Sequence, residues 1–112
     1  ILNKNLENLF QRMFEELDHE YMDPVKAAIL PPGGSTDFAD VTHVVPGIHP
    51  MIGIKTTPVP LHSKPFADAT LTPAGDDGLE VGIKCLAMAT VEVMTKPDLL
   101  KEIKDEFESK RL

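Results

Sequence analysis

The 112-residue chain contains no tryptophan, one tyrosine and one cysteine. So few large aromatic side chains argue against a stacking surface for bases or sugars. Because Cys85 is alone, it has no partner for an internal disulfide, and we expect a buried, unreactive thiol in a reducing, cytoplasmic compartment. No apolar run approaches the roughly 18 residues of a membrane span, and the N-terminus shows no basic-then-apolar signal pattern.

Cationic residues are also in short supply, since the formal net charge is -7. This charge argues against nucleic acid or an anionic membrane as a partner, because both attract clustered lysine and arginine. The length suits one modest hydrophobic core. The sequence starts at Ile1 rather than at a methionine, from which we expect a longer polypeptide upstream.

Three apolar patterns with helical spacing predict the main elements. The first covers residues 2–22. The second covers residues 79–94 and is apolar on more than one side, which indicates burial on more than one side. A last helix is predicted after Thr95, whose side chain suits an N-cap, with Pro97 in its first turn. Phe66 is expected to begin a short helix.

Two short strands are predicted, at residues 41–45 and 48–54. Pro50 makes the second an edge or an interrupted strand. The aspartate-rich residues 73–78 are expected to form a surface loop. Because a two-stranded sheet is marginal and cannot cover the apolar helix at 79–94, we expect either self-association or a larger α/β domain with further strands, and favour the latter.

A double-glycine turn runs into two hydroxyl side chains and a carboxylate: Gly33, Gly34, Ser35, Thr36 and Asp37. Exposed backbone N–H groups and hydroxyls suit a substrate carboxylate. A helix starting near Phe38 and capped by Ser35 or Asp37 explains the same residues without any ligand.

His62 lies in a proline-broken segment ahead of a helix. Its imidazole has the chemistry of a zinc ligand, with the other ring nitrogen oriented by an acceptor. The alternative is a surface histidine, since no H-x3-H or HExxH motif or cysteine pair accompanies it. His43 and His49 lie in strand-like runs, where hydrogen-bonded core histidines are expected.

Four motifs occur in an order that carries a family resemblance: Gly-Gly-Ser-Thr-Asp-Phe at 33–38, Val-Val-Pro-Gly-Ile-His-Pro-Met-Ile-Gly-Ile at 44–54, His-x-x-x-Phe at 62–66, and Pro-Asp-Leu-Leu at 97–100 after an apolar helix. This order resembles the C-terminal part of the aminoacylase and aminobenzoyl-glutamate hydrolase family of two-metal peptidases, in particular its amidohydrolase branch. The resemblance covers roughly residues 30–107.

The resemblance implies an α/β fold, namely a zinc-exopeptidase-like three-layer catalytic domain interrupted by a smaller lid domain that often mediates dimerisation. Residues 1–112 would then be a single partial domain, the C-terminal half of that catalytic domain with a few short strands. The implied reaction is hydrolysis of the amide bond of an N-acyl amino acid or a dipeptide, with two divalent ions, zinc or manganese, activating a water.

The resemblance also assigns roles to residues of this sequence. His62 would be the family's last metal ligand. Four loop residues would contribute to the substrate pocket: Gly33, Gly34, Ser35 and Thr36. Asp37 would stabilise that loop without contacting the substrate.

The family's His-x-Asp ligands and its catalytic glutamate belong to a segment that this sequence does not contain. We therefore expect a fragment that is inactive alone, binds no stoichiometric metal and forms a homo-oligomer. Two alternatives stay open. One is a non-catalytic, self-associating interaction module that keeps the half-fold, and the other is an acidic α+β domain of unrelated function.

Overall fold

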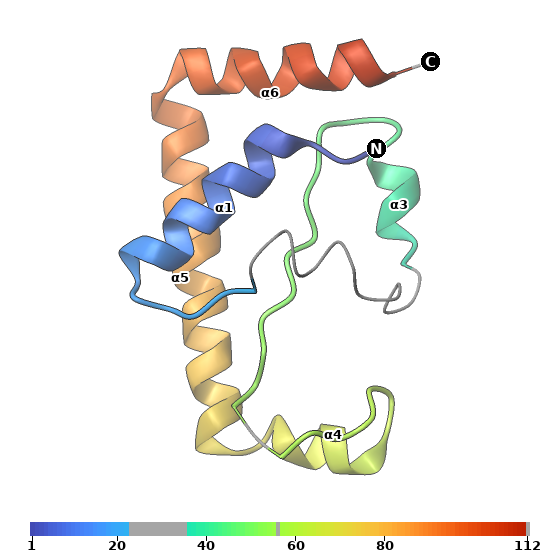
Figure 1. Cartoon of the computed structure of the whole chain (residues 1–112), viewed down its shortest axis with the longest axis vertical. Helices are drawn as coiled ribbons and strands as arrows, with labels where there is room; N and C mark the ends of the chain where they lie inside the picture. The colour runs from blue at the N-terminus through green and yellow to red at the C-terminus, as the bar shows by residue number, and fades with distance from the viewer. Residues whose placement is uncertain (23–35, 56, 112) are drawn as a thin grey trace.

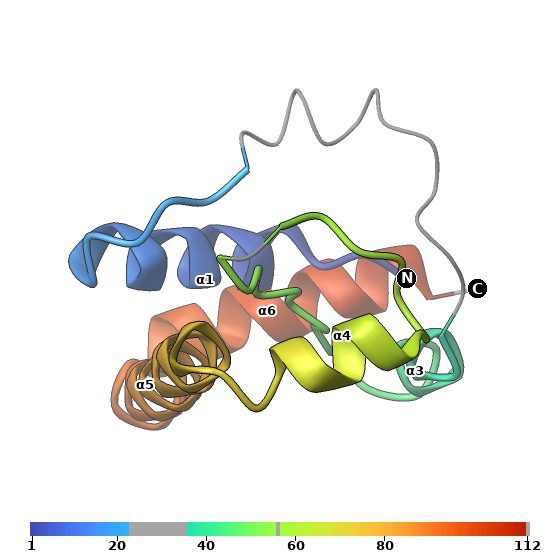
Figure 2. The same cartoon turned by 90° about the horizontal axis from the view of Figure 1, so that it is seen from below.

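The computed structural model describes residues 1–22, 36–55 and 57–111. These residues form five helices: α1 (Lys4–Glu16), α3 (Phe38–Val41), α4 (Lys64–Ala69), α5 (Pro73–Thr95) and α6 (Pro97–Lys110). Helix α5 runs along the long axis of the molecule, α1 crosses α5, and α6 lies across one end of α5. Helices α3 and α4 lie outside this group of three helices (Figure 1, Figure 2). None of the described helices has the length and apolar character to cross a membrane.

The radius of gyration of the molecule is larger than that of a compact domain of the same length. Its radius of gyration is 15.4 Å, whereas a compact domain of this length has about 13 Å. Eight hydrophobic side chains are buried among the described residues, and fourteen large hydrophobic ones are exposed. The buried core is therefore small for the apolar content of the chain.

Helix α1 ends six residues before the predicted end of the 2–22 pattern. Asp18 adopts a left-handed conformation with φ 50°. Its N–H donates to the Glu15 carbonyl, and the His19 N–H donates to the Phe14 carbonyl at 2.9 Å. These two bonds form a Schellman motif, which stops the helix without a proline or glycine.

Helix α5 begins six residues before the predicted start, so the prediction of a surface loop at 73–78 is wrong. The Thr72 side chain accepts from the Gly75 N–H, and Pro73 occupies the first turn. A threonine cap followed by proline starts a helix, and Asp76 in the first turn complements the positive end of the helix dipole. The composition suggested a loop, but the cap determines the structure.

Helix α6 follows α5 after a single residue, Lys96. Thr95 was predicted to cap α6, but it is the last residue of α5, and its hydroxyl donates to the Val91 carbonyl. Lys96 instead occupies the cap position of both helices, and its ammonium pairs with Glu92 at 2.6 Å. The sharp turn between the helices brings α6 back toward α1 (Figure 1).

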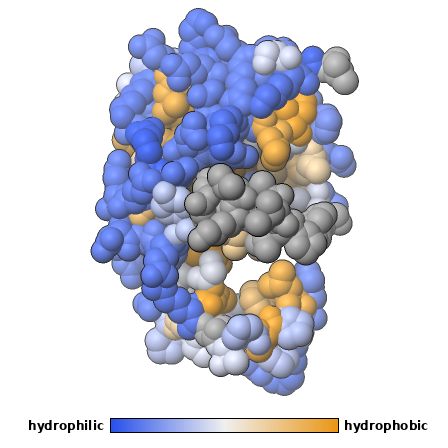
Figure 3. All heavy atoms as spheres, viewed as in Figure 1, coloured by the Kyte–Doolittle hydropathy of each residue, from blue (hydrophilic) through white to orange (hydrophobic). Residues whose placement is uncertain are grey.

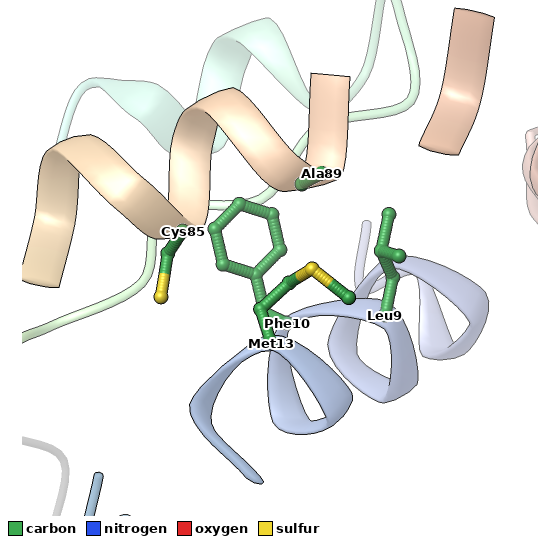
Figure 4. Close-up of a cluster of buried hydrophobic side chains, with 5 residues drawn as sticks. All are labelled: Leu9, Phe10, Met13, Cys85 and Ala89. Atoms are coloured by element: carbon green, nitrogen blue, oxygen red, sulfur yellow. The ribbon is translucent and has the colours of Figure 1, made fainter. Parts of the chain in front are cut away.

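The core forms where α1, α5 and α6 pack against one another. Helix α1 contributes Leu9, Phe10 and Met13, which face Cys85 and Ala89 of α5 (Figure 4). The prediction that Cys85 is buried is confirmed, since only 1% of it is exposed. Burial raises the pKa of its thiol, which keeps it protonated and unreactive.

The predicted strand at 41–45 is wrong, because residue 41 ends α3 and the following residues form a turn closed by bonds back to Phe38 and Val41. Residues 48–54 belong to no helix, and no ladder joins them to another described residue. A strand needs a hydrogen-bonded neighbour, and the described residues supply none. The expected α/β architecture is therefore neither present in nor excluded by this part of the chain.

Two side chains fix the start of α1 against α6. Asn3 caps α1 and donates through Nδ2 to the Ile103 carbonyl at 2.9 Å. The Glu106 carboxylate accepts from the Lys4 and Asn5 N–H groups at 2.7 and 2.9 Å. Backbone donors that a helix start leaves unpaired are thus satisfied by the neighbouring helix.

These contacts shift the titration of Glu106. Burial raises its pKa, but hydrogen bonds from Lys110 and from the backbone of Lys4 and Asn5 outweigh that effect and lower the pKa to about 2. Since the ordinary value is 4.5, this carboxylate contributes stability above that pH. The contribution is lost as the pH falls through about 2.

Replacing Glu106 with glutamine is expected to lower the free energy of unfolding at pH 7 by on the order of 2 kcal/mol, because a charged acceptor for four donors is lost. Urea unfolding measures the change. Glu108→Gln, an exposed neighbour, serves as the control and should change stability by less than about 0.5 kcal/mol. Equal stability of the two variants at pH 7 would contradict the role given to Glu106.

Candidate functional site

His62 stands at a bend directly before α4. Its φ of 57° places a non-glycine residue in the left-handed region, which is uncommon and concentrated at functional sites. The next residue, Ser63, caps α4 by accepting from the Phe66 N–H, and its hydroxyl donates to the Pro60 carbonyl at 2.6 Å. The bend therefore holds His62 on a fixed backbone with its side chain exposed.

The described residues do not complete a metal centre around His62. No group of three or more histidine, cysteine, aspartate or glutamate side chains gathers anywhere in residues 1–22, 36–55 and 57–111. One imidazole cannot hold two divalent ions, because each ion needs several protein ligands. The residues described here therefore do not fit a two-ion centre by themselves.

The predicted substrate loop falls mainly outside the described residues, which exclude Gly33, Gly34 and Ser35. Thr36 and Asp37 are exposed at the start of α3. The Thr36 hydroxyl accepts from the Phe38 N–H at 3.3 Å, whereas the Asp37 side chain makes no capping bond. The helix near Phe38 is thus confirmed, and Asp37 occupies its N-cap position without a side-chain capping bond. The predicted cap Ser35 lies outside the described residues.

The structure does not join these residues to His62. Within the described part of the chain, no hydrogen bond, ion pair or ring contact links His62 to Thr36 or Asp37. His43 and His49 are exposed, which corrects the prediction of core histidines. The ring centroids of His49 and Phe38 lie 5.3 Å apart, so His49 contacts α3 rather than the core.

An apolar groove with a volume of about 1030 Å³ lies beside α1. Its walls include side chains from α1, the extended segment and the two sides of His62: Phe10, Phe14, Ile52, Leu61 and Phe66. Figure 3 shows apolar side chains at the surface beside a hollow in the lower half of the view. The apolar pattern over residues 2–22 includes Phe10 and Phe14, but nothing in the sequence indicated a groove.

Sequence comparison supports a peptidase family for this chain. It is similar to Xaa-Arg dipeptidase from Mus musculus, with 34% identity over 110 residues, and to Xaa-Arg dipeptidase from Homo sapiens, with 32% identity over 108 residues. The alignments cover 98% and 96% of this chain, but only 25% and 24% of the relatives. The chain thus spans about a quarter of the length of these dipeptidases. No family model and no solved structure matches it.

The similarity extends over nearly the whole chain, including α1, His62 and both C-terminal helices. It supports a relationship to peptidases in general terms. It does not distinguish the aminoacylase and aminobenzoyl-glutamate hydrolase branch from other peptidases.

Proposed function

We propose that this chain is the C-terminal part of the α/β catalytic domain of a peptidase related to the aminoacylases. The complete protein would hydrolyse the amide bond of a dipeptide or an N-acyl amino acid. The observation that supports this most strongly is the similarity to two dipeptidases over 98% and 96% of the chain. The name of these relatives favours a dipeptide substrate.

The geometry supports a functional role for His62. An exposed imidazole on a left-handed bend, fixed by the Ser63 cap, is presented outward rather than packed. In the complete protein, His62 would supply one metal ligand, and the other ligands would come from outside this sequence. Four loop residues would contribute hydrogen-bond donors to the substrate carboxylate: Gly33, Gly34, Ser35 and Thr36. Asp37 would stabilise that loop without contacting the substrate.

With zinc or manganese added, the isolated chain should show no hydrolysis of dipeptides or N-acyl amino acids. The reason is that His62 is its one proposed metal ligand and that its described residues contain no cluster of further ligands. Product release measured by amine detection tests this expectation. Turnover that is lost in His62→Ala and kept in His43→Ala would show that the chain is complete by itself.

The alternative is an interaction module that keeps this half-fold without catalysis. The exposed apolar face of α5 is the observation that favours it. In that case a second copy would cover the face, so light scattering would give a stable dimer. A monomer in solution would argue against the module.

A further inference from the structure

Residues 18–22, which we call the strap, run back along α1 after that helix ends (Figure 1). The turn at Asp18 reverses the chain, and the N–H groups of Asp18 and His19 donate to carbonyls of the last turn of α1. The apolar groove beside α1 is lined by four residues of the strap: His19, Glu20, Tyr21 and Met22. The strap therefore forms one side of the groove.

The Tyr21 hydroxyl fastens the strap to α1. It donates to the Glu15 carboxylate at 2.7 Å and accepts from the Gln11 side chain at 2.9 Å. Gln11 also donates to Glu15 at 3.2 Å, which closes a network of three side chains. The bond from Tyr21, followed by that from Gln11, lowers the pKa of Glu15, so the acceptor is an ionised carboxylate at neutral pH. Hydrogen bonds to a charged acceptor are stronger than those between neutral groups.

The strap also covers Phe14 with two rings. The Tyr21 ring is stacked on Phe14 with the ring centroids 6.3 Å apart, and the His19 ring is tilted against Phe14 at 5.7 Å. Phe14 is half-buried and lines the groove. Because Tyr21 supplies the hydroxyl and one of the two rings, its release would uncover Phe14 and open this side of the groove.

The strap is attached at the surface and not through the core. Glu20, Tyr21 and Met22 are exposed, and none of residues 18–22 is among the buried side chains of the described chain. Segments with few buried contacts and exposed hydrogen bonds open at a low free energy. A side-chain network centred on one exposed tyrosine can therefore decide whether the strap lies on α1.

We propose that residues 18–22 open and close one side of the apolar groove, with the Tyr21 hydroxyl as the latch. Leu61 and Phe66, which precede and follow His62 in the sequence, line the same groove. The strap would therefore control access to the groove beside His62. This regulatory role rests on the proposed function of His62, whereas the latch itself does not.

Hydrogen exchange on the isolated chain tests the latch without any hydrolysis. Tyr21→Phe removes the hydroxyl and keeps the ring. The amides of Asp18 and His19, which close the turn, should then exchange at least about fivefold faster than in the parent. Hydroxyl-radical labelling of Phe14 should rise as well, although the ring that covers it is retained. Glu16→Gln, which neutralises an exposed neighbouring carboxylate, should change the exchange by no more than about twofold.

A second variant removes the acceptor and keeps the tyrosine. The chain has no tryptophan and one tyrosine, so its fluorescence reports on Tyr21 alone. In Glu15→Ala, acrylamide should quench this fluorescence more strongly than in the parent. The double variant Glu15→Ala/Tyr21→Phe should exchange no faster than Tyr21→Phe, because both changes break the same interaction.

The proposal is overturned if Tyr21→Phe exchanges and is labelled like the parent, or if the effects of the two changes multiply as independent ones. All these measurements are made on the isolated chain. A latch that behaves as expected in a protein whose hydrolysis does not depend on His62 would count against the proposed function alone.

Discussion

Replacing Gly75 with alanine should destabilise the junction between α4 and α5 by about 3 kcal/mol. An added Cβ would lie 2.7 Å from the carbonyl carbon of Thr70 and closer still to its oxygen. Both groups are backbone atoms, so no side chain can rotate to make room. Helix propensity alone predicts the opposite sign, because alanine is favoured over glycine by about 1 kcal/mol inside a helix.

The packing effect exceeds the propensity effect, so we expect a lower thermal midpoint and faster amide exchange through α4 and the first turn of α5. Gly53→Ala is the matched control, because nothing lies within 4 Å of its added Cβ. Its stability should stay within about 0.5 kcal/mol of the parent or rise slightly. A Gly75→Ala protein that is as stable as the parent would show that the junction between α4 and α5 is not held as described.

Replacing His62 with alanine should reduce kcat/KM for dipeptide hydrolysis by at least about a hundredfold in a chimera in which this chain replaces the aligned quarter of the Mus musculus dipeptidase. The reason is its proposed place as a metal ligand on a fixed bend. The change should not unfold the chain, because the side chain is exposed and makes no hydrogen bond to another described residue. The left-handed backbone strains an alanine as it strains a histidine, so the change does not relieve that strain. Stability is therefore measured on the parent and on the His62→Ala variant.

His43→Ala provides the comparison for His62, since it removes an exposed imidazole from the turn after α3. It should keep at least about half of the activity, in line with an exposed position away from special features. Equal activity of the two variants would remove His62 from the site. A loss in His62→Ala that is accompanied by unfolding would point to a structural role of the bend.

The long helices could be predicted from the sequence because their apolar residues repeat at three and four positions. Their ends could not, because they depend on local hydrogen bonds. Thr72 and the turn at Asp18 move the boundaries by six residues each, although neither interrupts the apolar pattern. The contact of Glu106 with the start of α1 joins residues about 100 apart, and no local signal encodes it.

The strand predictions illustrate a different limit. Val41 and its neighbours have the composition of a strand, but a short helix and turn form there, and residues 1–22, 36–55 and 57–111 offer no partner strand. Residues 48–54, the second predicted strand, lie in no helix or ladder of the described residues. Side-chain pattern selects the extended backbone, whereas a sheet requires a neighbouring strand that the described part of the chain does not contain.

The candidate site could be predicted only in part. The bend at His62 supports the residue that the motif order selected, but the sequence carried no information on its left-handed backbone. The predicted substrate loop lies largely outside the described residues. The resemblance supplied its role, and no contact in the structure tests it.

The central claim is that this chain carries one part of a hydrolase site and completes it only with further polypeptide. Elemental analysis of the purified chain, after exposure to zinc and desalting, measures this directly. The account predicts far less than one zinc ion per chain, with the same value in His62→Ala. One or two ions held per chain, and lost in His62→Ala, would contradict it, because His62 would then have found its partner ligands within these residues.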